Sequence, residues 1–532
     1  MKILPSLFND VVGPVMRGPS SSHTAASWRI ARIALELLNH PLEKALIEFD
    51  RDGAWAPNYR EQGTTMGING GLLGLEITDE RMKDTEHYAR QQGITIEYQV
   101  SSFPTNHANT ARLTLWGKSK KRVQVIAVSV GGGSFEITSV NGFPVQLHGD
   151  LYGIILFAQN KPDVREELKS IIPSEVKFTA EQKENIIKYE LKSSNPFATD
   201  LITRLKTNPA IDEISVIKPI MPITAGKQTK MPFTSIQSLL DYAEKEESDL
   251  GDLGLVYERC MSGIGVQELK DKMNEVIDII HNSLDTGLNG THYTDRILPQ
   301  QSHLIGQAEE EGKIVHSVIN RIIENVSALM ESKSAMEVVV ALPTAGSCGT
   351  VGGSLRAISE NLSSSREELN KAYFAAGIVG AYFAQGPGFS AEEHGCQVEC
   401  GAASGMAAAG IVQLMGGTAK QALDAASMAI QNMIGLVCDP VADRVEVPCL
   451  GKNISAAVNA YSSAIMSIAG FDAVIPLDQV IQTVSSVSKT MPACVKCTGK
   501  GGLAITETAL NIKNKLKGYS IQKGLKTNKR TK

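Results

Sequence analysis

The sequence has no apolar run of the roughly 20 residues that a membrane helix needs. Its best candidate, Phe374 to Phe389, is interrupted by Gln-Gly-Pro at 385–387. The apolar stretch at the N-terminus is broken by Pro5 and ends at residue 9, which is too short for the hydrophobic region of a signal peptide. We therefore expect a soluble, cytoplasmic protein with no membrane partner.

Acidic residues outnumber basic ones outside the C-terminus. The 532 residues include 52 Lys+Arg and 57 Asp+Glu, for a net charge of −5. Eight basic residues and no acidic ones lie between Asn511 and Lys532, which leaves the rest of the chain at −13. Because a nucleic-acid enzyme needs a basic binding face, we expect no nucleic-acid partner. We interpret residues 511–532 as a solvated basic tail.

Three cysteines of the second half lack the short CxxC-type spacing that zinc ribbons and ferredoxins use. Cys396, Cys438 and Cys449 stand at expected loop–helix junctions beside glycine or proline, separated by 42 and 11 residues. In a long cytosolic chain, cysteines are more often metal ligands or core thiols than disulfides. The spacing alone leaves both a thiolate-bound centre and buried structural thiols open.

The first half of the chain alternates strand and helix patterns. Residues 1–144 combine a helical pattern at 26–39 with strand patterns at 44–49, 95–100, 111–116 and 123–130, which predicts an α/β domain. Residues 145–222 follow the order strand-helix-strand-strand-helix-strand, the ferredoxin-like pattern. This segment resembles an ACT domain, which implies an amino-acid-binding regulatory module. A purely structural or dimer-forming module is the alternative.

The second half is helical by pattern. Residues 223–264 are predicted to be a polar linker, and 265–510 an all-α domain in which glycine and alanine allow close helix packing. The predicted fold class is thus α+β and multidomain. It has an N-terminal α/β domain, a ferredoxin-like ACT-type module and a C-terminal all-α domain that carries the cysteines.

An ordered series of motifs runs along nearly the whole chain. The motifs are Gly18-Pro19-Ser20-Ser21-Ser22-His23-Thr24, Pro343-Thr344-Ala345-Gly346-Ser347-Cys348-Gly349, Gly395-Cys396-Gln397 with Glu399, Cys438-Asp439-Pro440-Val441, Val447-Pro448-Cys449, Asn453, and Gly501-Gly502-Leu503-Ala504. In this order they resemble the iron–sulfur L-serine dehydratases. The β-type and α-type parts of that family are fused in one chain here.

The resemblance implies a lyase that converts L-serine to pyruvate and ammonia. It implies a [4Fe–4S] cluster held by Cys396, Cys438 and Cys449, and no pyridoxal phosphate. Three thiolates leave one iron open as a Lewis acid for the substrate hydroxyl. The implied substrate is a small amino acid, and the implied assembly is a homodimer or a higher homo-oligomer.

Hydroxyl and cationic side chains in these motifs are the candidate substrate-binding residues: Ser20, Ser21, Ser22, Thr24, Thr344, Lys452 and Asn453. The serine-rich run also fits the N-cap of the helix that follows, and both roles are compatible. The His107-Ala108-Asn109-Thr110 sequence matches a family His–Asn–Thr motif, so His107 is a candidate for proton transfer.

The chain departs from the family at the expected base. Where the family has Gly-His-Gly-Thr, this sequence has Glu61-Gln62-Gly63-Thr64, and a glutamine amide accepts no proton at neutral pH. We expect His107 or, second, Glu61 to take the role, with His23 as a further catalytic candidate. Lys452, in place of an arginine, keeps the charge but lacks the bidentate fork.

The family's C-terminal cysteine, which can cap the open iron, is also absent. Cys494 and Cys497 are possible fourth ligands; a redox pair and inert loop thiols are the alternatives. Two other functions stay open. One is a divergent iron–sulfur lyase for another β-hydroxy or β-thiol amino acid, such as threonine or cysteine. The other is a non-catalytic amino-acid sensor.

Overall fold

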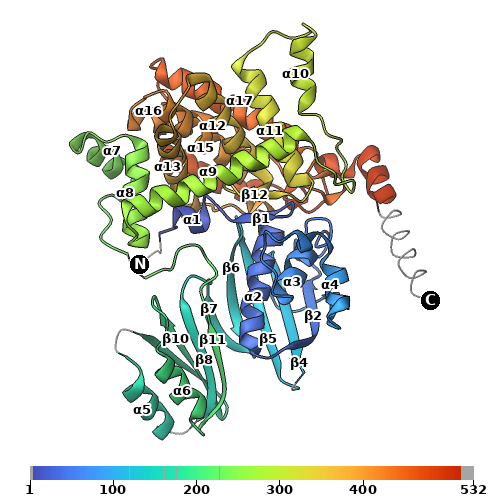
Figure 1. The fold of residues 1–532 in the computed structure, drawn as a ribbon, viewed down its shortest axis with the longest axis vertical. Coiled ribbons are helices and arrows are strands. Elements are labelled where there is room, and N and C mark those ends of the chain that lie inside the picture. The colour runs from blue at the N-terminus through green and yellow to red at the C-terminus, as the bar shows by residue number, and fades with distance from the viewer. Residues whose placement is uncertain (1–3, 119, 161, 174–175, 227, 517–532) are drawn as a thin grey trace.

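Two larger β-sheets, a two-stranded ribbon and a large helical region make up the described part of the protein (Figure 1). The computed structural model describes residues 4–118, 120–160, 162–173, 176–226 and 228–516. The strand-rich part is N-terminal and the C-terminal part is largely helical, which confirms the predicted mixture of α and β structure. Among the described residues, no helix combines the length and apolar character needed to cross a membrane.

The N-terminal part is a six-stranded sheet in the order β3-β2-β4-β5-β6-β7, with β2 and β3 parallel and the other neighbours antiparallel. Its strands are β2 (Leu42–Asp50), β3 (Thr95–Ser101), β4 (Thr110–Gly117), β5 (Arg122–Gly131), β6 (Ser134–Val140) and β7 (Phe143–Leu147). Its helices are α2 (Ala26–Leu38), α3 (Thr64–Leu72) and α4 (Thr85–Gln91). All five secondary-structure segments predicted here are confirmed to within two residues at either end.

Helix α2 covers this sheet because its apolar residues recur at helical spacing. Ile30, Ala34 and Leu37 of α2 are buried with Ile47 of β2 and Leu113 of β4 in one core. The N-terminus of α2 continues a single π-helical turn, η1 (Ser21–Ala25), that contains most of the serine-rich motif. Packing of α2 on the sheet therefore fixes where these serines lie.

The second sheet is built from the predicted strand-helix-strand-strand-helix-strand segment. Its elements are β8 (Tyr152–Gln159), α5 (Pro162–Ile171), β9 (Lys177–Lys183), β10 (Ile186–Ser193), α6 (Thr199–Thr207) and β11 (Ile211–Ile217). The strand order is β11-β8-β10-β9, with every neighbouring pair antiparallel. Figure 1 shows this unit beside the first sheet and away from the helical region.

The helical region forms the largest core. Its helices are α7 (Ile236–Lys245), α8 (Leu250–Ser262), α9 (Val266–Asn289), α10 (His303–Glu310), α11 (Val318–Ser334), α12 (Cys348–Leu362), α13 (Arg366–Gln385), α14 (Ala391–His394), α15 (Cys400–Leu414), α16 (Ala419–Gln431), α17 (Cys449–Ile468) and α18 (Leu477–Thr490). Helix α15 lies among α12, α13, α16 and α17. A Cβ at Gly405 would come within 2.6 Å of Ile430, so the glycine allows this close packing.

Residues 223–264, predicted to be a polar linker, contain α7 and α8. Leu239 of α7 and Leu253 of α8 are fully buried in the core of the helical region. The highly charged stretch from Tyr242 to Asp249 misled the prediction. It lies largely on the exposed side of α7 and in the turn between α7 and α8. At the other end, residues 507–516 are helical, so the predicted tail begins within a helix; residues 517–532 lie outside the described chain.

A two-stranded ribbon joins the N-terminal part to the helical region. Strand β1 (Val15–Arg17) pairs antiparallel with β12 (Val338–Val340). The serine-rich turn follows β1, and the turn η3 (Ala345–Ser347) follows β12. The ribbon thus brings two motifs more than 300 residues apart to the same place, where the backbone N–H of Ala345 donates to Oγ of Ser21 at 3.3 Å.

Candidate active site

The three candidate cysteines come from three separate segments and are all buried. Cys396 begins the short helix η4 (Cys396–Val398), Cys449 begins α17, and Cys438 lies in an extended segment after α16. The structure corrects one detail, because Cys438 does not lie at the expected loop–helix junction: the preceding helix α16 ends at Gln431. Gly395 precedes Cys396 with φ +77°, a conformation that favours glycine and turns the chain into the cysteine loop.

Cys396, Cys438 and Glu399 form a compact set of possible metal ligands. The sulfur atoms and one carboxylate oxygen lie within 4.8 Å of one another, and Sγ of Cys396 is 3.8 Å from Oε2 of Glu399. Burial raises the pKa of Glu399 to about 7. Contact with Cys396 and Cys497 raises the pKa of the Cys438 thiol. Two soft sulfur donors beside a carboxylate oxygen fit a thiolate-bound metal centre, whose metal would displace the thiol protons on binding.

One buried lysine, Lys333, and one partly buried lysine, Lys452, stand near the cysteines. Burial raises the pKa of the Cys449 thiol, and the positive charges of Lys333 and Lys452 act in the opposite direction. Lys452 donates from Nζ to the backbone oxygen of Val437 at 2.6 Å and to Oδ1 of Asp439 at 2.7 Å. Lys452, a candidate substrate contact, thus holds the segment on either side of Cys438.

The structure separates the two cysteines proposed as fourth ligands. Cys494 is exposed and Cys497 is buried. Cys438 and the Cys497 segment pair through backbone bonds, from Cys438 N to the Val495 oxygen at 2.8 Å and from Cys497 N to the Cys438 oxygen at 2.9 Å. Their side chains are also in contact. Cys497 therefore belongs to the cysteine site and Cys494 lies outside it.

The serine-rich turn faces this site from the N-terminal part. Ser20, Ser21, Ser22, His23 and Thr24 are all at least 90% buried. Oγ of Ser20 and Oγ of Ser22 each lie 3.1 Å from Nδ1 of His23. Thr24 donates from its hydroxyl to the backbone oxygen of Gln62 at 3.2 Å, and a Cβ on Gly63 would clash with this threonine at 2.4 Å. The serines and Gln62 are thus packed as one unit.

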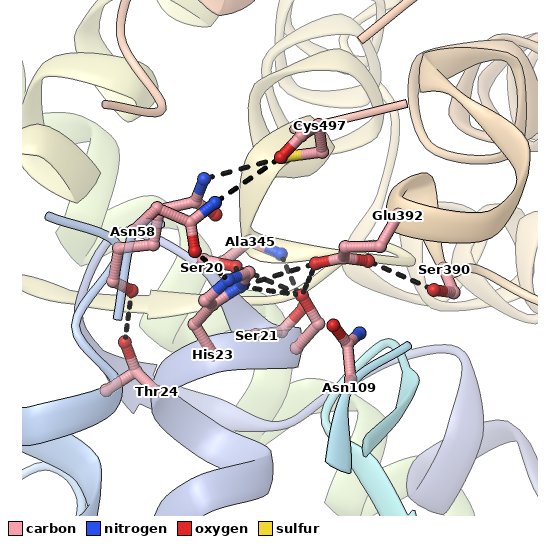
Figure 2. A network of polar contacts seen from close by, with 12 residues as sticks. Ser20, Ser21, His23, Thr24, Asn58, Asn109, Ala345, Ser390, Glu392 and Cys497 are labelled. Atoms are coloured by element: carbon pink, nitrogen blue, oxygen red, sulfur yellow. Dashed lines mark hydrogen bonds and ion pairs between the residues drawn. The ribbon is translucent and has the colours of Figure 1, made fainter. Parts of the chain in front are cut away.

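Asn109 is a buried carboxamide with no partner. Neither Oδ1 nor Nδ2 has a hydrogen bond among the described residues, although the side chain is fully buried. Figure 2 shows it beside the serine-rich turn and Glu392. Because unpaired buried polar groups are costly, a carboxamide left free at this place indicates room for a polar ligand or water.

Other candidates serve the protein framework. Asn453 donates from Nδ2 to the backbone oxygens of Gly346 at 2.8 Å and Cys449 at 2.9 Å, and accepts the Thr350 N–H at Oδ1. Its carboxamide therefore links α12, α17 and the η3 turn. Thr344 is buried and contacts Ser347, at an Oγ1–Oγ distance of 3.0 Å.

Glu61 lines a cavity of about 650 Å³ between the N-terminal part and residues 293–295, next to Pro19 and Gly63.

Helix α14 carries two residues that the sequence reasoning did not select. Oε1 of Glu392 lies 3.4 Å from Nδ1 of His23, and Oε1 of Glu393 lies 3.5 Å from Nε2 of His107. The signal for them was an acidic pair three and four residues before Cys396. Asn58, also not selected, donates to the backbone oxygen of Cys497 at 3.3 Å. No sequence feature marked this asparagine.

Comparison with known proteins places the chain in a family. The serine dehydratase alpha chain family matches residues 151–504. The "Probable L-serine dehydratase, alpha chain" of Bacillus subtilis (strain 168) is 33% identical over 294 residues, 54% of this chain and 97% of that protein. The "Probable L-serine dehydratase, beta chain" of the same organism is 40% identical over 152 residues, 29% of this chain and 68% of that protein.

A third relative is "L-serine dehydratase 1" of Escherichia coli (strain K12), 33% identical over 287 residues, 52% of this chain and 62% of that protein. The separate alpha and beta chains of Bacillus subtilis both match this one polypeptide. The chain therefore belongs to the serine dehydratase alpha chain family, in a form that fuses alpha-chain and beta-chain sequences.

Proposed function

We infer that the protein is an L-serine dehydratase, a lyase that converts L-serine to pyruvate and ammonia. The observation that carries this inference is the meeting of the Cys396–Cys438–Glu399 donor set with the serine-rich turn, in a chain of this family. The same arrangement argues against a non-catalytic sensor, since a sensor has no use for a metal site beside a hydroxyl-rich turn.

We propose a [4Fe–4S] cluster as the cofactor, held by Cys396, Cys438 and Cys449. The fit rests on three buried thiols from three loops and on two lysines whose charge offsets that of thiolates. An iron without a cysteine ligand supplies Lewis-acid chemistry for the departure of a hydroxyl group. Cys497, in contact with Cys438, is the better-placed of the two possible fourth ligands.

The remaining residues bind and orient the amino acid. Ser21 supplies a hydroxyl donor for the substrate carboxylate, since the hydroxyls of Ser20 and Ser22 contact His23 and Glu392. The unpaired amide of Asn109 supplies a donor and an acceptor beside it. Burial of the serine-rich turn excludes water from this region, which strengthens each polar contact. His107, Glu61 and His23 are the candidate proton-transfer residues.

The other parts of the chain have proposed roles as well. The order β11-β8-β10-β9 with two helices is that of a ferredoxin-like fold, which supports an ACT-type module at residues 145–222. We keep the proposed division into a β-type domain at 1–144 and an α-type domain at 265–510, with α7 and α8 packed on the latter. A cytoplasmic homodimer or higher homo-oligomer is the proposed assembly.

An assay of anaerobically purified protein tests the function. The protein is incubated with L-serine, L-threonine and L-cysteine, and keto acid and ammonia are measured. We expect the highest kcat/KM with L-serine. A preference for another β-substituted amino acid would favour the divergent lyase, for which Gln62 is the specific indication. No product from any of the three would contradict both enzyme assignments.

A further inference from the structure

Two histidines of the N-terminal part face two consecutive glutamates of α14. His23 lies against Glu392 and His107 against Glu393 (Figure 2 shows the first pair). The two pairs differ in burial, since His23 and Glu392 have 0% and 2% exposed side chains whereas His107 and Glu393 have 20% and 39%. A buried ion pair is shielded less by solvent, so the first pair interacts more strongly.

Nδ1 is the nitrogen that can accept a proton in both histidines, but its surroundings differ between the two. Nδ1 of His107 accepts the backbone N–H of Asn109 at 3.1 Å, so the neutral ring carries its proton on Nε2, toward Glu393. The basic nitrogen of His107 is therefore occupied by the backbone. In this arrangement His107 has no free lone pair for a substrate proton.

In His23 the basic nitrogen faces side-chain hydroxyls rather than a backbone N–H. Asn58 donates from Nδ2 to the backbone oxygen of Cys497, which turns Oδ1 toward Nε2 of His23 at 3.1 Å. The neutral ring therefore carries its proton on Nε2, and Nδ1 is the basic nitrogen. Nδ1 faces the hydroxyls of Ser20 and Ser22, both at 3.1 Å.

Glu392 holds this arrangement from across the domain boundary. Its Oε1 accepts the Ser22 hydroxyl at 2.8 Å and lies 3.4 Å from Nδ1 of His23. Its Oε2 accepts the Ser390 hydroxyl at 3.0 Å. With Ser22 committed to the carboxylate, the Ser20 hydroxyl is the one left to donate to Nδ1.

We propose that His23 accepts the substrate α-proton through Ser20, and that Glu392 is the positioning residue that orients His23 and stabilises its protonated ring. The proposal rests on the proposed function. It assigns to His23 the proton transfer that Gln62 cannot perform.

The proposed step conserves atoms, electrons and protons. The α C–H bond breaks and its proton moves to Oγ of Ser20, while the proton of that hydroxyl moves to Nδ1 of His23. The C–H electron pair forms the second, π bond between the α- and β-carbons as the β C–O bond breaks. The departing hydroxide takes the proton from Nδ1 of His23 to form water, which returns His23 to its neutral form.

The electrostatics support this pairing. Burial lowers the pKa of His23, and the negative charge of Glu392 raises it. Glu392 is the charged group that faces the ring from α14; the segment before α3 contributes the neutral Asn58 and Trp55, whose ring is 5.9 Å from that of His23. The hydrogen bond to Asn58 also raises the pKa of His23, so without the Glu392 carboxylate this one neutral contact is left to oppose the effect of burial.

The variants Glu392→Gln, Glu392→Asp and Glu393→Gln of the full chain, purified anaerobically, test the proposal. Glu392→Gln keeps the shape but removes the charge, so we expect kcat for L-serine to fall about 10²-fold with KM changed less than threefold. The fall of kcat/KM at low pH, which reports protonation of His23, should shift to lower pH in Glu392→Gln. Glu392→Asp should recover part of kcat, and Glu393→Gln should leave the pH of this fall unchanged.

A second measurement is independent of turnover. The ¹⁵N chemical shifts of His23, assigned with His23→Gln, should show Nε2 protonated at neutral pH and Nδ1 titrating. In Glu392→Gln the titration should move to lower pH. A neutral ring protonated on Nδ1, or an unchanged titration in Glu392→Gln, would overturn the proposal. Inactivity of the wild-type protein on all amino acids tested would instead contradict the proposed function.

Discussion

The side-chain amide of Gln62 donates to Sγ of Cys497 at a distance of 3.5 Å. These residues are 435 positions apart in the sequence and meet because the turn before α3 lies over the segment that pairs with Cys438. The position at which the resembled family has histidine is therefore in contact with the cysteine site. A glutamine here serves as a donor to sulfur and takes no part as a base.

Restoring a histidine at this position should have little effect on the reaction. If His23 accepts the proton, Gln62→His changes kcat for L-serine less than threefold, as measured by pyruvate formation. Gln62→Asn is the control for loss of the contact with Cys497. A gain of ten-fold or more in the histidine variant alone would contradict this prediction and favour a chain that has diverged from L-serine.

Substitution of the two candidate histidines should have unequal effects. We expect His23→Gln to lower kcat about 10²-fold or more, since it removes the basic nitrogen that faces the serine-rich turn. His107→Gln should lower kcat by less than ten-fold, because Nδ1 of His107 is occupied by the backbone N–H of Asn109. A larger loss in His107→Gln than in His23→Gln would assign the proton transfer to His107.

The cysteine ligands should be distinguishable by iron content. Anaerobically purified protein should be brown and contain about four irons per chain, as a cubane cluster requires. Alanine at Cys396, Cys438 or Cys449 should abolish the iron and the visible absorption. Cys260→Ala is the matched control, because this cysteine lies on α8, outside the three ligand loops. A colourless, zinc-containing protein that turns over L-serine would contradict the cluster.

Cys497 and Cys494 should differ in pre-steady-state kinetics. If Cys497 occupies the fourth iron position at rest, product formation begins with a lag while substrate displaces it. Cys497→Ser should abolish this lag with a nearly unchanged steady-state rate. Cys494→Ser should retain the lag, because this side chain is exposed. A wild-type protein without a lag, or a lag unaffected by Cys497→Ser, would make Cys497 a structural thiol.

A buried carboxyl predicts a pH dependence of stability. Burial raises the pKa of Glu258 on α8 to about 8, although Ser6 donates to it from Oγ at 2.7 Å and Leu7 from its backbone N–H at 2.6 Å. Its folded-state pKa lies above the unfolded value, so its contribution to stability is present at low pH and is lost as the pH rises through about 8.

Thermal unfolding of Glu258→Gln measures this effect. The variant should lose less stability than wild type between pH 6 and 9, since a neutral amide requires no deprotonation in the core. Glu367→Gln, at an exposed ion pair with Lys270, is the control and should follow wild type. Equal pH dependence in Glu258→Gln and wild type would show that Glu258 is not the group responsible.

The local structure followed from the sequence because it depends on short-range periodicity. The helix at 26–39 and the strands at 44–49 and 123–130 were predicted to within two residues, since apolar spacing there matches the buried face of one element. The segment 223–264 was not predicted to be part of the core. Its helices alternate apolar and charged residues, and only the packing of α8 on α13 and of α7 on α8 and α16 shows that the apolar side is buried.

The cysteine ligands were likewise proposed from motifs, but their partners were not. Cys396 and Cys438 stand in recognisable loops, whereas Glu392, Asn58 and Asn109 carry no local signal that tells a site residue from a surface one. The sequence by itself thus determined the secondary structure where apolar periodicity was regular, together with the inventory of reactive groups. The tertiary structure alone decided which groups meet, because the β1–β12 ribbon joins segments hundreds of residues apart, and long-range contacts leave no periodic trace in the chain.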